Sequence, residues 1–318
     1  MSKVIVTDHG FPNLDPERQV LAPAGIDLEE IRPICKTEDD VIRTCRGAKV
    51  LLVQWAKVGA RALDALPEVR CIVRYGVGVD NFDLQAAKTR GVIACNVPDY
   101  CVEEVSNHAL ALILSLARRL PQDHTQLRQG GWGIGSFGPI PAFTDLTLGV
   151  VSLGRIARRV VEKAKVFGFR PIAFDPLLPE AVFAQCGAER VDLDTLLARA
   201  DVLSLHCPLT PETRHLIRAQ TLARMKKGAI LVNTSRGPVV AEADLVEALR
   251  AGHLSGAGLD VFEVEPLPTD SPLRSLPNVV LSSHAAAVSE RAMVMLQTKA
   301  AQAALDFLQG RRPRSALT

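Results

Sequence analysis

No apolar stretch in this 318-residue sequence reaches the roughly 18 residues that suggest a membrane-spanning helix. The longest candidate, Ala109 to Ala117, contains Ser115 and is followed by Arg118 and Arg119, so we expect a buried helix there. The opening residues MSKVIVTDHG turn polar too early for a secretory signal peptide. We therefore expect a globular protein without a membrane partner.

A strong net charge is also missing from the sequence. The 37 lysines and arginines nearly balance the 35 aspartates and glutamates, which leaves a net charge of +2. Proteins that bind nucleic acids or acidic membrane surfaces usually carry a basic excess or stripe. The composition therefore predicts no nucleic-acid partner.

Cysteine pairs of the C-x-x-C kind are absent. The seven cysteines are dispersed and odd in number, which is typical of reduced thiols and predicts a cytoplasmic protein. They are Cys35, Cys45, Cys71, Cys95, Cys101, Cys186 and Cys207. Histidines do not group with cysteines or acids at the spacing of metal ligands, so no metal site is expected.

Short apolar runs alternate with helical patterns along the chain, whose length suffices for two domains of ordinary size. Because these runs are continuously apolar, we expect strands buried on both faces, as in a parallel sheet. The first strand candidates are Lys3–Asp8, Lys49–Gln54, Arg70–Tyr75 and Val92–Val97, with helices near Asp40 and Asp83. This series predicts one α/β domain that ends near Pro98.

A long helix is expected next, from about Val102 to Leu120, closed by Pro121. A glycine- and proline-rich excursion follows, from Gly130 to Pro141. A second α/β series then predicts a doubly wound sheet. Its strand candidates are Leu148–Ser152, Pro171–Phe174, Val202–Leu205, Ala229–Asn233, Gly256–Val261 and Val279–Leu281, and its helices are Arg155–Gly168, Leu193–Arg199 and Ala241–Ala251. A last helix, about Ser289 to Leu308, is expected to pack back on the first domain.

The stretch VVSLGRIARR, Val150 to Arg159, has the strand–turn–helix plan that binds dinucleotides, usually written G-x-G-x-x-G. The middle glycine, Gly154, lets the backbone approach a pyrophosphate at the helix N-terminus, and Ala157 suits the third position. Ser152 departs from the motif at the first position. Asp175 follows the next strand, where it either accepts hydrogen bonds from the ribose of NAD or only opens an Asp-Pro turn.

Three later strand ends carry residues suited to acid–base chemistry. Arg236 follows one strand, Glu265 a second and His284 a third. Ligands of open α/β sheets bind outside the carboxyl ends of the strands, so we expect these side chains to converge. Alone, each residue would more often be a surface ion pair or a structural residue, and only the combination favours a site.

These motifs, in this order, resemble the D-isomer-specific 2-hydroxyacid dehydrogenase family over nearly the whole chain. The resemblance rests on RYGVGVDNFDL, LGRIA with FDP, LHCPLT, NTSRGPVV, GLDVFEVEP and the late histidine. NVPDYCVEEVSNHAL, AKVFGF and SSHAAAVSE are further similar to the branch that contains the C-terminal-binding proteins. Ala287 stands where animal members of that branch have a tryptophan.

The resemblance implies two doubly wound α/β domains, a Rossmann nucleotide domain inserted in a flavodoxin-like substrate domain. The substrate domain would comprise residues 1–98, the nucleotide domain 99–287, and a C-terminal helix in 288–318 would return to the substrate domain. The helix after Val102 and the glycine-rich excursion resemble the family's dimer contact, so a homodimer is expected.

The resemblance also implies the activity, a reversible NAD-dependent reduction of a 2-keto acid to a D-2-hydroxy acid. His284 would be the general acid and base, because a histidine has an unperturbed pKa near neutrality. Glu265, preferred to Glu263 because it directly precedes the proline, would favour the protonated ring. Arg236 would hold the substrate carboxylate and keto oxygen with its planar fork.

For substrate binding, the resemblance points to the first domain. Backbone N–H groups of Val77 and Gly78 would hold the substrate carboxylate. Trp55 and Tyr75 would either cover an aliphatic or aromatic tail of the keto acid or only pack the domain, and two nearby basic residues are compatible with an acidic tail.

For the cofactor NAD, the resemblance implies a longer set of residues in the second domain. Asp260 would support the nicotinamide and His206 would line the adenosine side, whereas His215 is expected on a helix surface. Ser152 is expected in an ordinary β conformation with its hydroxyl toward water, the alternative being a strained positive φ. The implied cofactor-binding residues are Gly154, Arg155, Ile156, Asp175, His206, Cys207, Pro208, Thr213, Thr234, Ser235 and Asp260.

A second function remains open from the branch resemblance, an NAD-binding, dimeric, corepressor-like recruitment module with little catalysis. A disordered tail would favour recruitment. The chain instead ends at GRRPRSALT, soon after its last expected helix, and carries the full catalytic set. Both features favour the enzyme.

Overall fold

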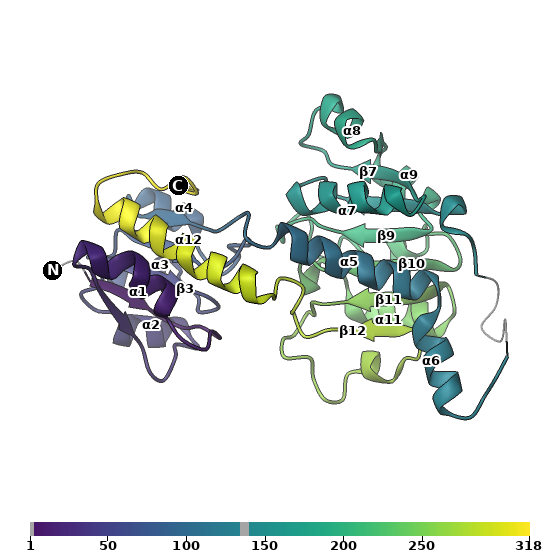
Figure 1. Ribbon diagram of the computed structural model, residues 1–318, viewed down its shortest axis with the longest axis horizontal. Coiled ribbons are helices and arrows are strands. Elements are labelled where there is room, and N and C mark those ends of the chain that lie inside the picture. The colour runs from purple at the N-terminus through teal and green to yellow at the C-terminus, as the bar shows by residue number, and fades with distance from the viewer. Residues whose placement is uncertain (1–2, 134–139) are drawn as a thin grey trace. The chain divides into compact units, whose positions relative to one another are not determined.

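The computed structural model describes residues 3–133 and 140–318, which form two compact units (Figure 1). Unit 1 consists of Met1–Cys101 and Val288–Thr318, so the C-terminal segment returns to the N-terminal part of the chain. Unit 2 consists of Val102–Ala287. The central part of the predicted glycine-rich excursion, residues 134–139, lies outside the described residues.

The described part of unit 1 contains a five-stranded sheet in which all neighbouring strands are parallel. The strands are β1 (Lys3–Val6), β2 (Asp27–Glu30), β3 (Val50–Val53), β4 (Cys71–Arg74) and β5 (Ile93–Cys95). Their order, β2-β1-β3-β4-β5, is the flavodoxin-like one, which reverses direction between β1 and β3. A topological switch point of this kind is where open α/β sheets bind ligands.

Helices cover both faces of this sheet. On one face α12 packs against α1 and contacts β3 and β4. On the other, side chains of α2, α3 and α4 join those of the strands in one apolar cluster. The helices of unit 1 are α1 (Asp15–Leu21), α2 (Glu38–Thr44), α3 (Ala60–Ala65), α4 (Leu84–Thr89) and α12 (Glu290–Leu308), with a 3₁₀ turn at Ala22–Ala24.

Unit 2 is built on a seven-stranded sheet that is again parallel throughout its described strands. The strands are β6 (Thr147–Val151), β7 (Arg170–Phe174), β8 (Glu189–Arg190), β9 (Val202–Leu205), β10 (Ala229–Asn233), β11 (Leu254–Leu259) and β12 (Val279–Leu281). The order β12-β11-β10-β9-β6-β7-β8 is that of a Rossmann sheet with one further strand, and it reverses between β6 and β9.

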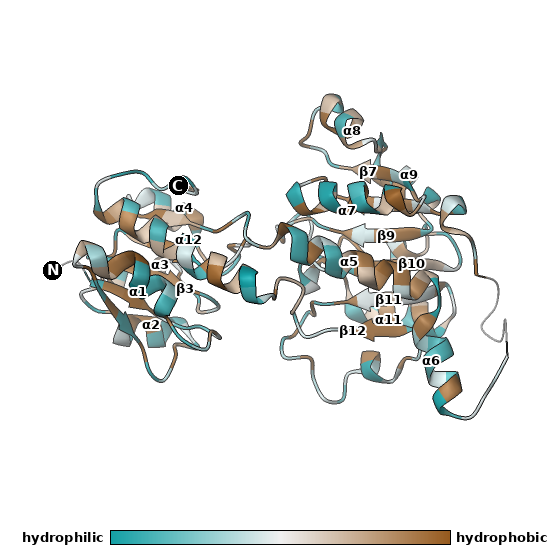
Figure 2. Ribbon diagram, viewed as in Figure 1, coloured by the Kyte–Doolittle hydropathy of each residue, from teal (hydrophilic) through white to brown (hydrophobic). Residues whose placement is uncertain are grey.

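The helices of unit 2 form one apolar cluster around α5 and α7 and a second around α9 and α11, on opposite faces of the sheet. Figure 2 colours most of β10 brown, as expected for a strand buried on both faces. The predicted fold class, two doubly wound parallel α/β domains, is confirmed. The helices are α5 (Val102–Ala117), α6 (Leu120–Arg128), α7 (Arg155–Val166), α8 (Glu180–Cys186), α9 (Leu193–Arg199), α10 (Ala219–Leu222) and α11 (Glu242–Arg250), with 3₁₀ turns at Phe143–Asp145, Gly237–Val239 and Pro272–Ser275.

The long helix predicted to end at Pro121 is two helices. α5 ends at Ala117, and α6 begins at Leu120 after Arg119, which has a left-handed φ of 55°. Pro121 lies in the first turn of α6, where the missing N–H costs no hydrogen bond. The proline therefore begins a helix instead of closing one. No helix among the described residues is long and apolar enough to cross a membrane.

Candidate active site

The predicted nucleotide-binding turn joins β6 to α7. Gly154 is the N-cap residue of α7, and a Cβ atom added there would meet no other protein atom within 4 Å. Open space thus lies over the N-terminus of a 12-residue helix, where backbone N–H groups and the helix dipole favour a phosphate. Ala157, in the first turn, is fully buried, as close packing of this helix on the sheet requires. Arg155 is exposed and Ile156 half-buried beside Gly154.

Asp175 connects this turn to the end of β7. Its Oδ2 accepts hydrogen bonds from the N–H of Leu153 at 2.9 Å and from the Ser152 hydroxyl at 3.2 Å. Its Oδ1 accepts from the N–H of Leu177 at 3.0 Å. Asp175 therefore does open the turn that follows it, and it also braces the nucleotide turn. A carboxylate has about four acceptor positions, so capacity for a ribose hydroxyl remains.

The predicted β conformation of Ser152 is wrong. Its φ is +67°, in the left-handed region that glycine adopts without cost. The N–H of Ser152 donates to the carbonyl of Phe174 at 2.8 Å, and this bond together with the Leu153 bond to Asp175 imposes a sharp bend where β6 ends. The serine hydroxyl donates to Asp175 instead of pointing toward water.

His284 and Glu265 lie together at the carboxyl edge of the same sheet. Nδ1 of His284 is 2.7 Å from Oε2 of Glu265, and the two side chains are 44% and 37% exposed. Burial acts to raise the pKa of Glu265, but the hydrogen bond and charge of His284, with help from Arg236, hold it below its usual value. Glu265 is therefore a carboxylate that occupies Nδ1, which leaves Nε2 as the ring nitrogen that can act on a ligand.

The backbone at His284 is held in a costly conformation by Asp260. His284 has a φ of +53°, and its N–H donates to the Asp260 carbonyl at 2.8 Å. The buried Asp260 carboxylate accepts from the N–H groups of Ala285 at 2.9 Å and Ala286 at 3.0 Å, and from the Ser282 hydroxyl at 2.6 Å. The carboxylate of Asp260 thus faces the His284 loop, whereas contact with the nicotinamide remains a prediction.

Arg236 stands on a loop that is packed directly against the loop of Glu265. Asn233 binds both ends of this loop: its side chain donates to the Arg236 carbonyl at 2.9 Å and accepts from the Ser235 N–H at 3.0 Å. A Cβ atom at Gly237 would lie only 1.8 Å from the carbonyl oxygen of Phe262, so no other residue fits there. The structure therefore brings Arg236, Glu265 and His284 to one edge of unit 2.

The predicted adenosine side lies after β9. Burial lowers the pKa of His206 to about 4, so its ring is neutral, and Nε2 is 2.8 Å from the Ser204 hydroxyl. Burial raises the pKa of Cys207 to about 11, which excludes a reactive thiolate there. The Thr213 hydroxyl donates to the Pro208 carbonyl at 2.6 Å and so closes this loop.

Thr234, directly after β10, offers an independent sign of a ligand. Its hydroxyl oxygen is buried and makes no hydrogen bond within the described residues. Leaving such a group unpaired costs about 1–3 kcal/mol, so a partner in a bound nucleotide fits this position. The neighbouring Ser235 hydroxyl, by contrast, already donates to Asn233 at 2.9 Å.

In unit 1 the predicted substrate residues have different environments. Val77 and Gly78 are partly exposed after β4, and the Asn96 side chain fixes their loop by donating to the Val77 carbonyl at 2.6 Å. Trp55 is 55% exposed. Tyr75 is only 1% exposed and donates its hydroxyl to a buried glutamate, so the prediction that it covers a substrate tail is wrong. The tyrosine packs the domain.

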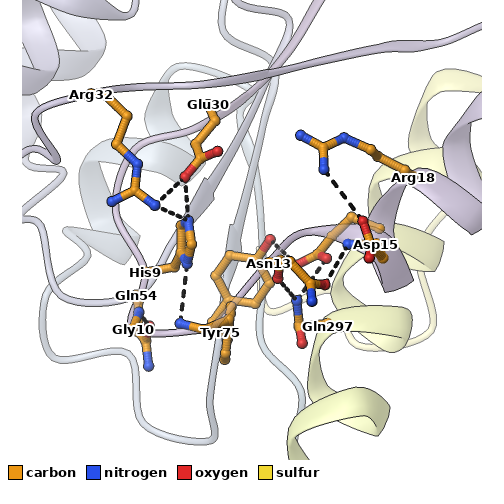
Figure 3. Close-up of polar contacts among 12 residues, drawn as sticks. His9, Gly10, Asn13, Asp15, Arg18, Glu30, Arg32, Gln54, Tyr75 and Gln297 are labelled. Carbon is orange, nitrogen blue, oxygen red and sulfur yellow. Dashed lines mark hydrogen bonds and ion pairs between the residues drawn. The ribbon is translucent and has the colours of Figure 1, made fainter.

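The carboxyl edge of unit 1 carries a cluster of polar residues that no motif had indicated. Figure 3 shows His9 between Glu30 and the chain that follows β1. Nε2 of His9 lies 2.7 Å from Glu30 Oε1, and Nδ1 accepts from the Phe11 N–H at 3.1 Å. Arg32 pairs with the same glutamate oxygen. Asp8, next to His9, ends the apolar run Lys3–Asp8 that predicted the first strand, and a polar residue at a strand end is the one signal that could have indicated this cluster.

His215 is not the helix-surface residue that was predicted. It lies in a turn between β9 and α10 with a φ of +50°, and its Nε2 is 2.5 Å from Oε1 of Glu263. Glu263 therefore contacts His215 and Glu265 contacts His284, so the two glutamates have different roles. Among the described residues, no group of three or more His, Cys, Asp or Glu side chains could hold a metal ion.

Comparison with known families identifies the second unit. Residues 110–286 match the model of the D-isomer specific 2-hydroxyacid dehydrogenase NAD-binding domain. A glyoxylate reductase of Korarchaeum cryptofilum is 38% identical over 288 residues, which cover 90% of this chain and 86% of that enzyme. A D-3-phosphoglycerate dehydrogenase of Methanocaldococcus jannaschii is 38% identical over 312 residues. This chain spans only 58% of the length of the latter enzyme.

Solved structures agree with this comparison over the full length of the chain. A protein of Thermus thermophilus superposes with a TM-score of 0.87 at 35% identity and covers 99% of this chain and all of its own. The D-lactate dehydrogenase of Aquifex aeolicus, solved with NAD and lactic acid, superposes with a TM-score of 0.84 at 28% identity. That match covers 97% of this chain and 96% of the lactate dehydrogenase.

Proposed function

Because the chain belongs to the D-isomer-specific 2-hydroxyacid dehydrogenase family, we propose that it reduces a small 2-keto acid to a D-2-hydroxy acid with NADH, reversibly. The observation that carries this proposal is the 2.7 Å contact between His284 and Glu265 at the sheet edge that also bears Arg236. A histidine with a purely structural role does not need to combine an ionised partner, partial exposure and a neighbouring guanidinium.

The proposed mechanism assigns one task to each of these side chains. NAD, when bound, supplies the hydride that adds to the carbonyl carbon. Glu265 occupies Nδ1 and favours the protonated ring, so Nε2 of His284 donates its proton to the keto oxygen. Arg236 binds the carboxylate and polarises the keto oxygen through its planar fork. In the reverse direction, Nε2 accepts the proton of the hydroxyl group.

NAD suits unit 2 for three reasons. The open N-terminus of α7 at Gly154 accepts a pyrophosphate, the buried Thr234 hydroxyl needs a partner, and Asp175 lies where a ribose is expected. A 2′-phosphate would meet the Asp175 carboxylate, so we expect NADH to be preferred to NADPH. In unit 1, the backbone N–H groups of Val77 and Gly78 are the proposed donors to the substrate carboxylate.

The substrate class follows from the relatives and from one exposed ring. The relative from Korarchaeum is named a glyoxylate reductase, and the Aquifex structure contains lactic acid. We infer that glyoxylate, hydroxypyruvate, pyruvate and keto acids with a short apolar tail are the compounds to test. The exposed Trp55 ring is the proposed contact of such a tail.

The experiment is NADH oxidation, followed by absorbance, against a panel of these keto acids. We expect at least one to be reduced, with a D-configured product identified by chiral chromatography. If NADH binds but no keto acid is reduced, the dehydrogenase proposal fails and the recruitment function of the similar branch takes its place. If NADH does not bind either, both proposals fail.

We further propose a homodimer that uses α6 and the residues after it. Leu120, Leu127 and Trp132 expose large apolar side chains along this segment, and Trp132 is 89% exposed. Several large exposed apolar side chains on one short segment favour an interface when they form a shared patch. Light scattering should give twice the chain mass for the unmutated protein and a lower mass for the double variant Leu127→Lys, Trp132→Lys.

A further inference from the structure

Glu263, two residues before the proposed partner of His284, is held from three sides. Its Oε1 is 2.5 Å from Nε2 of His215, and its Oε2 accepts the N–H of Glu242 at 3.0 Å. The N–H of Glu263 itself donates to the Glu242 side chain. The backbone of Glu263 is thus tied to the start of α11, and its side chain is tied both to the start of α11 and to the turn of His215.

His215 is fixed just as firmly. Its N–H donates to the carbonyl of Pro238 at 2.8 Å, and two residues on, the N–H of Ile217 donates to Val239 at 3.0 Å. Its left-handed φ of +50° costs about 1–2 kcal/mol for a residue with a Cβ atom, so these bonds must hold it there. Pro238 and Val239 belong to the loop that follows Arg236.

The His215–Glu263 contact and the bond from the His215 N–H to Pro238 together join three loops at the carboxyl edge of unit 2. The loop after β9 carries His215, the loop after β10 carries Arg236, and the loop after β11 carries Glu263 and Glu265. Direct packing of Gly237 on Phe262 joins the last two. Each of these loops bears a residue that the proposed mechanism uses for cofactor, substrate or proton transfer.

We propose that His215 and Glu263 are positioning residues that set the place of Glu265 and, through it, the protonation of His284. The inference rests on the proposed dehydrogenase function. Val264, which separates the two glutamates, is 59% exposed and is not part of the buried core. The turn is held by the buried Phe262 side chain and by Leu267, which packs on the same core cluster, but its polar anchors beside Glu265 are Glu263 and the Phe262 N–H, which donates to Glu265 Oε1 at 3.0 Å.

The arrangement of charged groups at this edge also depends on the contact between His215 and Glu263. Three carboxylates, those of Glu242, Glu263 and Glu265, gather on two packed elements; burial and the charges of the other two raise the pKa of Glu242. The groups that face them are the His284 ring and the Arg236 guanidinium on the side of Glu265, and the His215 ring on the side of Glu263. Removing His215 leaves Oε1 of Glu263 without its ring partner and lets the turn move.

The test compares His215→Ala with His215→Gln, which keeps an N–H donor for Glu263. In His215→Ala we expect kcat for keto-acid reduction to fall about tenfold, equivalent to about 1.4 kcal/mol of barrier. The KM of the keto acid and the Kd of NADH should change less than about twofold, because neither ligand touches His215 in this proposal. His215→Gln should recover most of the lost kcat.

Two pH readouts separate positioning from mere stabilisation. The fall of the reduction rate at high pH should begin at lower pH in His215→Ala, since a displaced Glu265 favours the protonated ring less. The NMR signal of the His284 ring should also titrate at lower pH, a measurement that needs neither substrate nor turnover. This second readout distinguishes failure of the pair from failure of the dehydrogenase proposal.

His253 provides a matched control in the same unit. It precedes β11, whereas Glu265 follows that strand, and its Nε2 lies 2.8 Å from the carbonyl of Leu222. His253→Ala should lower the melting temperature and leave kcat and both pH readouts unchanged. If His215→Ala behaves like His253→Ala, the positioning role is overturned; equal losses in Ala and Gln variants at position 215 would overturn it as well.

Discussion

The carboxylates at the carboxyl edges of the two parallel sheets have opposite environments. In unit 1, the Asp8 carboxylate after β1 is 1% exposed and accepts hydrogen bonds from three consecutive backbone N–H groups, those of residues 54 to 56. In unit 2, the carboxylate of Glu265 after β11 is partly exposed and shares one oxygen with His284. The same topology rule places both carboxylates, but that of Asp8 binds backbone and that of Glu265 binds a partly exposed histidine ring.

The difference lies in what each polar group has left to offer. Both ring nitrogens of His9 have protein partners, and its side chain is almost completely buried (Figure 3). His284 has one nitrogen engaged and one that can reach a ligand. A polar cluster at a sheet edge can thus bind a ligand when some of its donors and acceptors have no partner within the protein. It has a structural role when the protein itself satisfies all of them.

Among the variants that test this comparison, we expect the largest effect on ligand binding from a change at Gly154. Gly154→Val should weaken NADH binding at least about 1,000-fold, about 4 kcal/mol, because the branched side chain fills the space needed for the pyrophosphate. The fold should tolerate it, since a Cβ atom there meets nothing within 4 Å. Calorimetric titration measures the affinity, and tight binding by the variant would place the nucleotide elsewhere.

Arg236→Ala should have the next largest effect, on substrate binding and chemistry but not on NADH binding. A charged contact to substrate is worth roughly 2–5 kcal/mol, so kcat/KM should fall by about 30-fold or more. NADH affinity and thermal stability should stay close to those of the unmutated chain. Near-full activity of the variant would remove Arg236 from the site.

Asp8→Ala should show the opposite pattern. Leaving three backbone N–H groups without an acceptor should lower the free energy of unfolding by about 2–3 kcal/mol, measured by urea denaturation. The affinity of unit 2 for NADH should not change. If the variant were as stable as the parent but inactive, Asp8 would belong to chemistry and the contrast between the two edges would fail.

Glu265→Gln tests the charge at the edge of unit 2. Because the pKa of Glu265 is lowered, its carboxylate is ionised throughout the neutral range and favours the protonated His284 ring. The neutral amide lacks this effect, so the fall of the reduction rate with rising pH should move to lower pH by about one unit, about 1.4 kcal/mol. A pH–rate profile identical to that of the parent would contradict the proposed effect of Glu265 on His284.

Buried strands were predictable from the sequence and polar edge strands were not. β9 and β10, buried throughout, have the predicted bounds because their residues are mostly apolar. β12 has them too, because this edge strand is itself apolar. β2, with the sequence DLEE, and β8, with ER, lie at sheet edges. Their pairing depends on backbone hydrogen bonds to a neighbouring strand, and their charged side chains leave no pattern to detect.

The site shows the same limit at the level of single residues. The contact of Glu265 with His284 follows from strand order, because parallel strands end at one edge. Tyr75 also follows a strand, yet its side chain turns inward to a glutamate of α1. His215 required knowledge of a turn conformation with positive φ, which no periodicity signals. Strand order predicts where a residue lies, while burial and partners, which depend on the whole fold, decide its role.

The smallest predicted effect concerns Ser152, which joins the strained backbone of unit 2 to Asp175. Its φ of +67° is set by hydrogen bonds within the fold, from its own N–H to Phe174 and from Leu153 to Asp175. The strain therefore acts on the free and the nucleotide-bound protein alike, and cancels in the affinity. Ser152→Gly should change the Kd of NADH by less than about fivefold, about 1 kcal/mol.

The free energy of unfolding distinguishes the cost of backbone strain at Ser152 from the contribution of its hydrogen bond to Asp175. Ser152→Ala keeps the Cβ atom and loses the 3.2 Å bond to Asp175, so its unfolding free energy should fall by about 1 kcal/mol. Ser152→Gly loses the same bond but also the left-handed cost of about 1–2 kcal/mol, so it should be at least as stable as the parent. Urea denaturation of both variants measures the difference directly. Equal stability of Ala and Gly would show an unstrained turn, and a gain in NADH affinity well above fivefold for Gly would show strain confined to the bound form.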